Sequence, residues 1–134
     1  MAKKWLDYCS NSHSSCISLE SEEAQLPSRV LDLCYETLTS DDRLRLVETS
    51  DLTATATYEY VTLSHRWGNP PPPETTTRNM DKHKECILLN ELPRTFRDAV
   101  AFVKVMNVRY LWVDSLCILQ DSREDKEREI PMMD

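Results

Sequence analysis

The sequence predicts an α/β fold in which a partly parallel sheet is flanked by helices. Segment 58–67 is rich in aromatic and β-branched residues, which favour strands. Segment 92–107 places its apolar residues at helical spacing. Segment 108–119 follows it directly and is apolar on both faces, the pattern of a central parallel strand covered on each side. A strand, a helix and a second strand in succession indicate that the two strands pair in parallel.

The elements before residue 58 are expected to be shorter. A helix near Trp5 is followed by a polar loop. Strands are expected at 29–36, which is largely apolar, and at 44–48, where apolar and charged residues alternate. Polar, β-branched residues then connect this second strand to the segment that begins at residue 58.

Two helices are expected between the two longer strands. Four consecutive prolines follow Gly68, and because proline cannot join a helix or a ladder, they predict an extended surface loop. A first helix is expected at 79–91. The second, at 92–107, is expected to be capped by Thr95, with Asp98 three residues on completing a capping-box-like pair.

The chain is expected to form one domain, 1–134, because its length suits a single hydrophobic core. The N-terminal part, 1–57, contains the cysteine- and histidine-bearing segment and the first two strands, and 58–134 contains the remaining elements. The last segment, 122–134, reads as an amphipathic helix. The chain stops inside this helix, so we expect a domain that is truncated at its C-terminus.

Composition excludes several classes of function. The net charge of −7 and the lack of a Lys/Arg cluster argue against a nucleic-acid partner. The single glycine, Gly68, rules out a phosphate-binding loop or a dinucleotide fingerprint, which need several glycines at fixed spacing. No segment has the length of a membrane span, and the first residues have no signal-peptide core, so a cytoplasmic protein is expected.

Polar side chains follow the two longer strands, at the edge where open α/β sheets bind ligands. The first strand supplies Ser64, His65, Arg66 and Trp67, and the second supplies Asp114, Ser115 and, further on, Gln120 and Asp121. A buried carboxylate such as Asp114 is costly unless it is paired. We expect Asp114 to face the Ser64–Gly68 segment in one cleft. It either orders a polar pocket there, or has only the structural role of pairing with Arg66 or capping the turn.

The terminal helix adds Asp121, Asp125 and Glu129, which are spaced four residues apart and therefore share one face. Two interpretations are open. The three carboxylates form a solvated helix face, which is the common case. Alternatively, one of them, Glu129, points into the cleft.

Cys9, His13 and Cys16 have a spacing that resembles part of a zinc site. Zinc takes four ligands, and Cys34 or His65 is available as the fourth. Buried or capping roles for these residues are the alternative, and the more common one. In a cytoplasmic protein the cysteines are expected to be thiols or metal ligands rather than disulfides.

Three ordered blocks, "YVTLSHRWG", "LPRTFRDAV" and "VRYLWVDSLCILQDSREDKEREIPMM", resemble the signature blocks of the fungal heterokaryon incompatibility (HET) domain. With the preceding "WLDYCSNSHSSC" and "LPSRVLDL", the resemblance covers residues 5–133. Lys126 and Pro131 depart from the usual pattern of the family. The resemblance implies a domain of fungal nonself recognition that triggers programmed cell death. HET domains are also similar to Toll/interleukin-receptor-like (TIR) domains, which implies a flavodoxin-like sheet and cleavage of NAD with a catalytic glutamate.

On this resemblance Glu129 and Asp114 are the catalytic candidates. The candidate ligand-binding residues are Ser64, Arg66, Trp67, Ser115, Gln120 and Asp125, and Cys117 lies in the same block. In NAD cleavage a carboxylate would stabilise the oxocarbenium-like ribosyl group after nicotinamide leaves. The rival hypothesis is a non-catalytic signalling module that self-associates or binds protein partners. A third is an adaptor domain stabilised by zinc.

Overall fold

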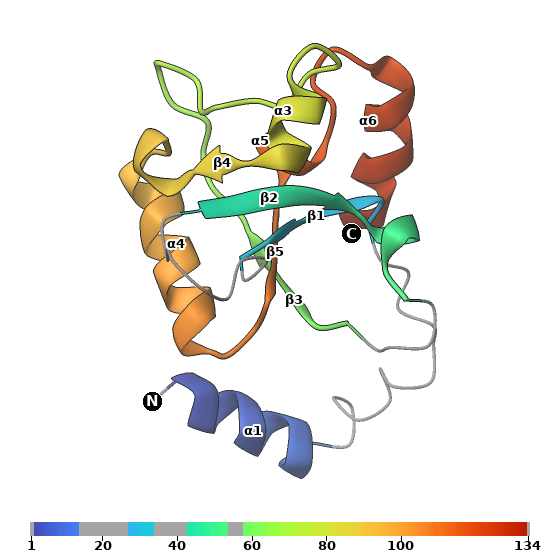
Figure 1. The fold of residues 1–134 in the computed structure, drawn as a ribbon. Helices are drawn as coiled ribbons and strands as arrows, with labels where there is room; N and C mark the ends of the chain where they lie inside the picture. Colours follow the sequence, from blue (N-terminus) through green and yellow to red (C-terminus); the bar gives the residue numbers. More distant parts are fainter. Residues whose placement is uncertain (1, 14–26, 34–42, 54–57, 134) are drawn as a thin grey trace.

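The computed structural model describes residues 2–13, 27–33, 43–53 and 58–133, and in these residues a five-stranded mixed sheet is flanked by helices (Figure 1). The strands are β1 (Arg29–Asp32), β2 (Arg43–Glu48), β3 (Tyr60–Leu63), β4 (Ile87–Leu88) and β5 (Tyr110–Val113). Their order across the sheet is β3-β5-β1-β2-β4. The helices are α1 (Ala2–Ser12), α3 (Met80–Glu85), α4 (Arg94–Val105), α5 (Asp114–Cys117) and α6 (Arg123–Glu129).

The predicted α/β fold with a partly parallel sheet is confirmed. Strands β3 and β5 pair in parallel, as expected for strands joined through a helical crossover. The other pairs, β1–β5, β1–β2 and β2–β4, are antiparallel. The sheet therefore differs from a flavodoxin-like sheet, in which the strands run mostly parallel.

The centre of the sheet lies at β1 and β5, where every residue is buried. Leu31 and Leu111 are partners across this pair, and each is 1% exposed. Phe96, Val100 and Val103 of α4 belong to the same core. Asp32 is buried beside them, and Arg109 neutralises it through two hydrogen bonds of 2.8 Å. Strand β5 fits the rule that strands covered on both faces are almost continuously apolar, whereas β1 carries two buried charged residues, each paired with a residue of opposite charge.

Several predicted elements are confirmed with changed bounds. The helix near Trp5 is α1, and the strand expected at 44–48 is β2, which begins one residue earlier. The strand expected at 29–36 runs from Arg29 to Asp32, and its last predicted residues lie outside those described. The strand expected at 58–67 pairs only from Tyr60 to Leu63.

Two predictions between β3 and β5 were wrong. The helix expected at 79–91 ends at Glu85, because Ile87 and Leu88 pair with β2 as strand β4 and Ile87 is buried. A short 3-10 turn, η3 (Leu89–Glu91), follows. The cap of α4 is Pro93 rather than Thr95, and its carbonyl accepts bonds from the amides of the first turn.

The prediction of one strand over 108–119 was also wrong for the second half of that segment. It ends at Val113, and Asp114 begins the single helical turn α5. The Asp114 carboxylate accepts a 2.7 Å bond from the amide of Ser115, and its backbone carbonyl accepts one from Ile118. An apolar run suits a buried helical turn as well as a buried strand, so periodicity alone does not separate them.

The final helix is confirmed as α6, with Ser122 as its cap, followed by the 3-10 turn η4 (Ile130–Met133). Another short turn, η2 (Thr49–Asp51), follows β2. In Figure 1, α4 and α6 lie at opposite ends of the view, with the strands between them. None of the described helices has the length and hydropathy that a membrane crossing requires.

Replacement of Leu111 by alanine tests the position of the core. Because Leu111 is buried between β1 and β3, we expect L111A to lower the free energy of unfolding by about 2–5 kcal/mol. The control is V105A on α4, where the side chain is 79% exposed and the expected change is below about 0.5 kcal/mol. Urea denaturation followed by circular dichroism measures both, and equal losses would contradict this account of the core.

Candidate functional site

The ends of the parallel strands β3 and β5 bring two polar segments together. The indole Nε1 of Trp67 donates a 2.9 Å hydrogen bond to Oδ2 of Asp114. The Nδ1 atom of His65 lies 3.7 Å from Oδ1 of the same carboxylate. The segment after β3 therefore meets the residue that begins α5, at the edge of the sheet where ligands were expected.

The predicted pairing of Arg66 with Asp114 was wrong. Side chains alternate in an extended segment, so His65 and Trp67 contact Asp114 while Ser64 and Arg66 are exposed. Among the described residues, Arg66 forms no salt bridge with Asp114. The Asp114 carboxylate is thus bonded to the Trp67 indole. The half-buried imidazole of His65 lies beside it and packs edge-on against Phe96, with 4.9 Å between the ring centroids.

A pocket of about 280 Å³ opens beside this contact. It is lined by Trp67, Asp114, Ile118, Gln120, Lys126 and Ile130. The Nε2 atom of Gln120 donates to the backbone carbonyls of Asp114 and Ile118, each at 3.0 Å, which fixes the amide at the wall. The Asp114 side chain is 28% exposed, so its carboxylate is accessible from solvent. The pocket thus combines an aromatic ring, a carboxylate and an ammonium group.

The loop after the prolines is held against this region by backbone pairing. The amide of Thr75 donates to the carbonyl of Ser115 at 2.9 Å, and the amide of Gln120 donates to the carbonyl of Thr75 at 2.8 Å. The Thr75 hydroxyl bonds to Nδ1 of His83 at 2.8 Å, and burial lowers the pKa of that imidazole. Ser115, predicted to bind a ligand, is fully buried beneath the loop, and its hydroxyl has no hydrogen-bond partner among the described atoms.

Asp121, the first of the three carboxylates predicted for the terminal helix, also holds the loop that follows the prolines. Both the amide and the hydroxyl of Thr77 donate to it, at 2.9 Å and 2.6 Å. These hydrogen bonds lower the pKa of the Asp121 carboxyl, because they stabilise its ionised form. Asp121 therefore anchors the loop at the surface.

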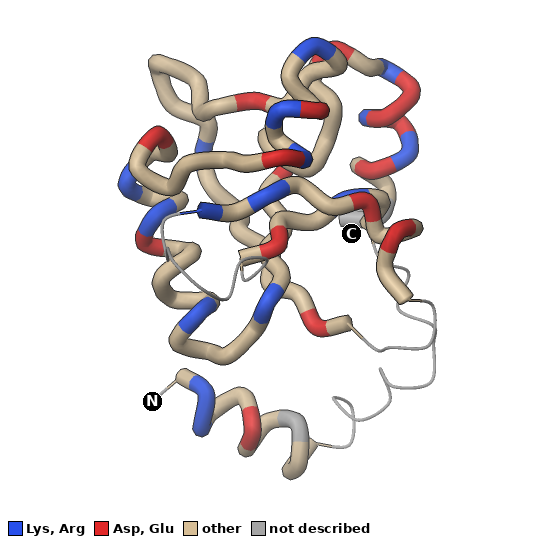
Figure 2. Tube along the Cα trace, viewed as in Figure 1, with Lys and Arg blue, Asp and Glu red and all other residues tan. Residues whose placement is uncertain are grey.

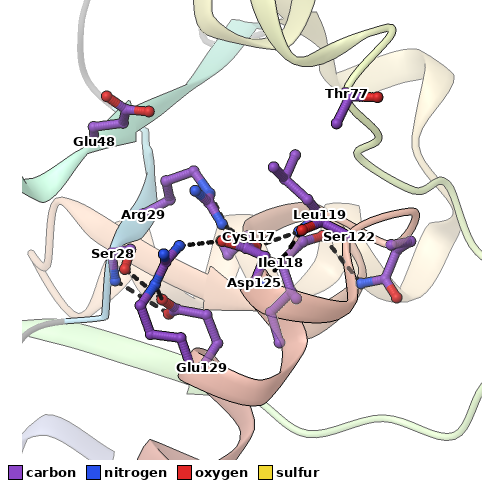
Figure 3. Close-up of polar contacts among 12 residues, drawn as sticks. Ser28, Arg29, Glu48, Thr77, Cys117, Ile118, Leu119, Ser122, Asp125 and Glu129 are labelled. Carbon is purple, nitrogen blue, oxygen red and sulfur yellow. Dashed lines mark hydrogen bonds and ion pairs between the residues drawn. The ribbon is translucent and has the colours of Figure 1, made fainter.

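The other two carboxylates, Asp125 and Glu129, are buried on α6 (Figure 3). Asp125 pairs with Arg29 and Arg128 and accepts a 2.7 Å bond from the amide of Leu119. Glu129, 1% exposed, accepts bonds from the hydroxyl of Ser28 and, at 3.1 Å, from its amide. The interpretation as a solvated helix face was therefore wrong for both residues.

We name Ser28, Arg29, Asp125, Arg128 and Glu129 the α6 anchor. Arg128 also donates to Glu129 at 3.2 Å, and Nε of Arg29 donates to the carbonyl of Cys117 at 2.9 Å. Two cations face two anions, so the anchor carries no net charge. Figure 2 shows that α6 carries both acidic and basic positions. Buried charges are tolerated only when they are paired and hydrogen-bonded in this way.

Glu129 does not line the pocket, and its catalytic role stays a prediction. Its two carboxylate oxygens face Ser28, at the start of β1, as Figure 3 shows. The sequence-based reasoning missed Ser28 and Arg29. The available signal was an arginine at the head of an apolar strand, where a charged side chain needs a buried partner.

The cysteines do not form a complete metal site in the described part of the chain. Burial raises the pKa of the Cys117 thiol to about 12, so it stays protonated at neutral pH. Cys9 Sγ lies 3.4 Å from Nδ1 of His13 on α1, whereas Cys16 and Cys34 lie outside the described residues. In the described ranges no group of three or more His, Cys, Asp or Glu side chains is placed to hold a metal ion. The zinc assignment stays a prediction.

Comparison with known proteins identifies one related family. The family model described as "Heterokaryon incompatibility protein (HET)" matches residues 60–134, more than half of the chain. The match begins at β3 and contains the whole pocket wall and the α6 side of the anchor. No curated protein and no solved structure matches the chain.

Removal of one partner from the α6 anchor tests its contribution to stability. In R29M the buried carboxylate of Asp125 loses a partner, and we expect a loss of about 3–5 kcal/mol in the free energy of unfolding. The control is R123M, which removes the solvent-exposed pair Arg123–Glu127 and costs less than about 1 kcal/mol. Urea denaturation of both variants measures the difference. Similar losses in the two variants would show that the anchor is no stronger than a surface pair.

Proposed function

Because the chain belongs to the heterokaryon incompatibility (HET) family, we propose that it triggers programmed cell death in fungal nonself recognition through contacts with protein partners or with further copies of itself. In this proposal the matched region supplies a folded surface. Catalysis by Glu129 is not required, and the buried carboxylates of α6 serve only to stabilise the folded domain.

The observation that carries this proposal is the burial of Glu129 against Ser28. A catalytic carboxylate must reach a substrate, whereas Glu129 is only 1% exposed and is held against Ser28. Its partner Ser28 directly precedes β1 and lies outside the matched range 60–134. Ser28 and the first residue of β1, Arg29, therefore help to hold α6 in place.

Cell death on expression in a filamentous fungus tests this proposal. We expect D114N to kill like the unmodified chain, because the pocket carboxylate is dispensable for a contact surface. We expect E129Q to lose killing together with folded protein, because an amide cannot accept both bonds from Ser28 and each lost bond costs about 1–3 kcal/mol.

The matched control is E127Q, at an exposed position on the same helix. Growth arrest is scored together with soluble protein level and thermal unfolding for every variant. An E129Q protein with unchanged stability but no killing would contradict the proposal and favour catalysis by Glu129.

Cleavage of NAD is a second candidate function, favoured by the composition of the pocket. Trp67 offers a stacking surface, Lys126 a cation for phosphate, and Asp114 a carboxylate for an oxocarbenium-like ribosyl group. The accessible carboxylate is Asp114, so in this mechanism it replaces Glu129 as the catalytic group. The pocket volume of about 280 Å³ lies just below the usual range of about 300–1,000 Å³ for ligand sites, so the pocket would hold only part of a dinucleotide.

Release of nicotinamide from NAD, followed by chromatography, tests this second function. If the pocket cleaves NAD, D114N abolishes release while E127Q retains it, at equal concentrations of folded protein. Equal release by D114N and the unmodified chain would exclude Asp114 as the catalytic group. No release from folded protein would remove NAD cleavage as a function of this chain.

A further inference from the structure

Asp114 and Lys126 line one pocket but form no salt bridge with each other or with another acid, lysine or arginine of the described residues. The Asp114 carboxylate accepts bonds from two neutral groups, the Trp67 indole at 2.9 Å and the Ser115 amide at 2.7 Å. Of the described basic side chains only that of His65 comes close, with Nδ1 3.7 Å from Oδ1. The pocket therefore contains two opposite charges that the fold does not pair.

The other charges that the fold covers are treated differently. In the α6 anchor two cations face two anions, and Asp32 is neutralised by Arg109. Asp114 and Lys126 share a cavity of about 280 Å³, so one small molecule can reach both. Covering either charge without replacing its hydration is costly, so the ligand itself has to supply the opposite charge.

The signs of the two charges disfavour ligands that carry a single charge. A simple cation would be attracted by Asp114 and repelled by Lys126, and a simple anion would experience the reverse. A molecule with one positive and one negative group is attracted by both side chains. Gln120 adds a neutral acceptor, because its Nε2 atom is bonded to two backbone carbonyls while its Oε1 atom forms no hydrogen bond with the described residues.

The rest of the pocket wall is apolar. Trp67 and Ile130 are 38% and 53% exposed, and Ile118 completes the lining. These side chains suit an apolar group on the ligand. The small volume favours a molecule of about the size of a single amino acid over a larger one.

We propose that this pocket binds a free amino acid with an apolar side chain. The ammonium group of the ligand donates hydrogen bonds to Asp114 and to Oε1 of Gln120, and its carboxylate pairs with Lys126. Its side chain lies against the ring of Trp67 and the two isoleucines. A quaternary ammonium ligand fits less well, because it has no N–H group to donate. This inference depends neither on the proposed role in cell death nor on cleavage of NAD.

Isothermal titration calorimetry of the full chain with L-phenylalanine and with L-leucine tests the inference. We expect binding at one site, and an affinity about 10–100-fold lower in D114N and in K126M, because each variant removes a charge-assisted hydrogen bond. The matched controls E127Q and K82M remove charges at exposed positions outside the pocket and keep the affinity of the unmodified chain. Thermal unfolding establishes that each variant is folded.

Two analogues of phenylalanine distinguish loss of a specific contact from a general effect of the substitutions. The methyl ester lacks the carboxylate, and 3-phenylpropionate lacks the ammonium group. We expect the unmodified chain to bind each analogue at least about tenfold more weakly than phenylalanine. We expect K126M to bind the ester as well as phenylalanine, and D114N to bind 3-phenylpropionate as well as phenylalanine, because the missing ligand group has already lost its partner.

Three results would overturn the inference. If the folded chain bound neither amino acid, the pocket would not be an amino-acid site, and binding of NAD in the same experiment would favour the dinucleotide instead. Unchanged affinity in both D114N and K126M would place the ligand elsewhere on the molecule. The same preference for phenylalanine over both analogues in every variant would contradict the partners assigned to its two charged groups.

Discussion

The buried pair between Arg29 and Asp125 is the interaction on which the rest of the structure depends. It joins residues 96 positions apart in the chain and fixes α6 against the first strand. Because β1 lies between β5 and β2, the pair connects the last helix to the centre of the sheet. Lys126 and Ile130 line the pocket from α6 and the turn that follows it, so the pair also helps to position this wall of the pocket.

The positions of Trp67 and Asp114 at the pocket follow from the parallel pairing of β3 and β5. Because β3 and β5 run in the same direction, the residues after each strand emerge at one edge of the sheet. The short turn α5 then directs Asp114 toward Trp67, and the Thr75 loop covers Ser115 from the other side. Burial of Ser115 and exposure of Asp114 thus result from one change of backbone conformation, at Val113.

The sequence predicts those features of the fold that depend on the local pattern of apolar and polar residues. The strand segments, the amphipathic helix α4 and the meeting of the 64–68 segment with Asp114 follow from periodicity and from the rules of α/β connection. The partners of Asp125 and Glu129 could not be predicted, because nothing local specifies which distant residue neutralises a carboxylate. Strand β4 was missed because its two residues carry too little pattern to be distinguished from the end of a helix.

The charge balance of the α6 anchor has a consequence for how copies of the domain meet in solution. Two arginines offset two carboxylates there, so the formal net charge of −7 comes entirely from residues outside the anchor. These charges repel one another over roughly 8–10 Å at physiological ionic strength and farther in dilute buffer. Repulsion between identical molecules therefore weakens as the ionic strength of the medium rises.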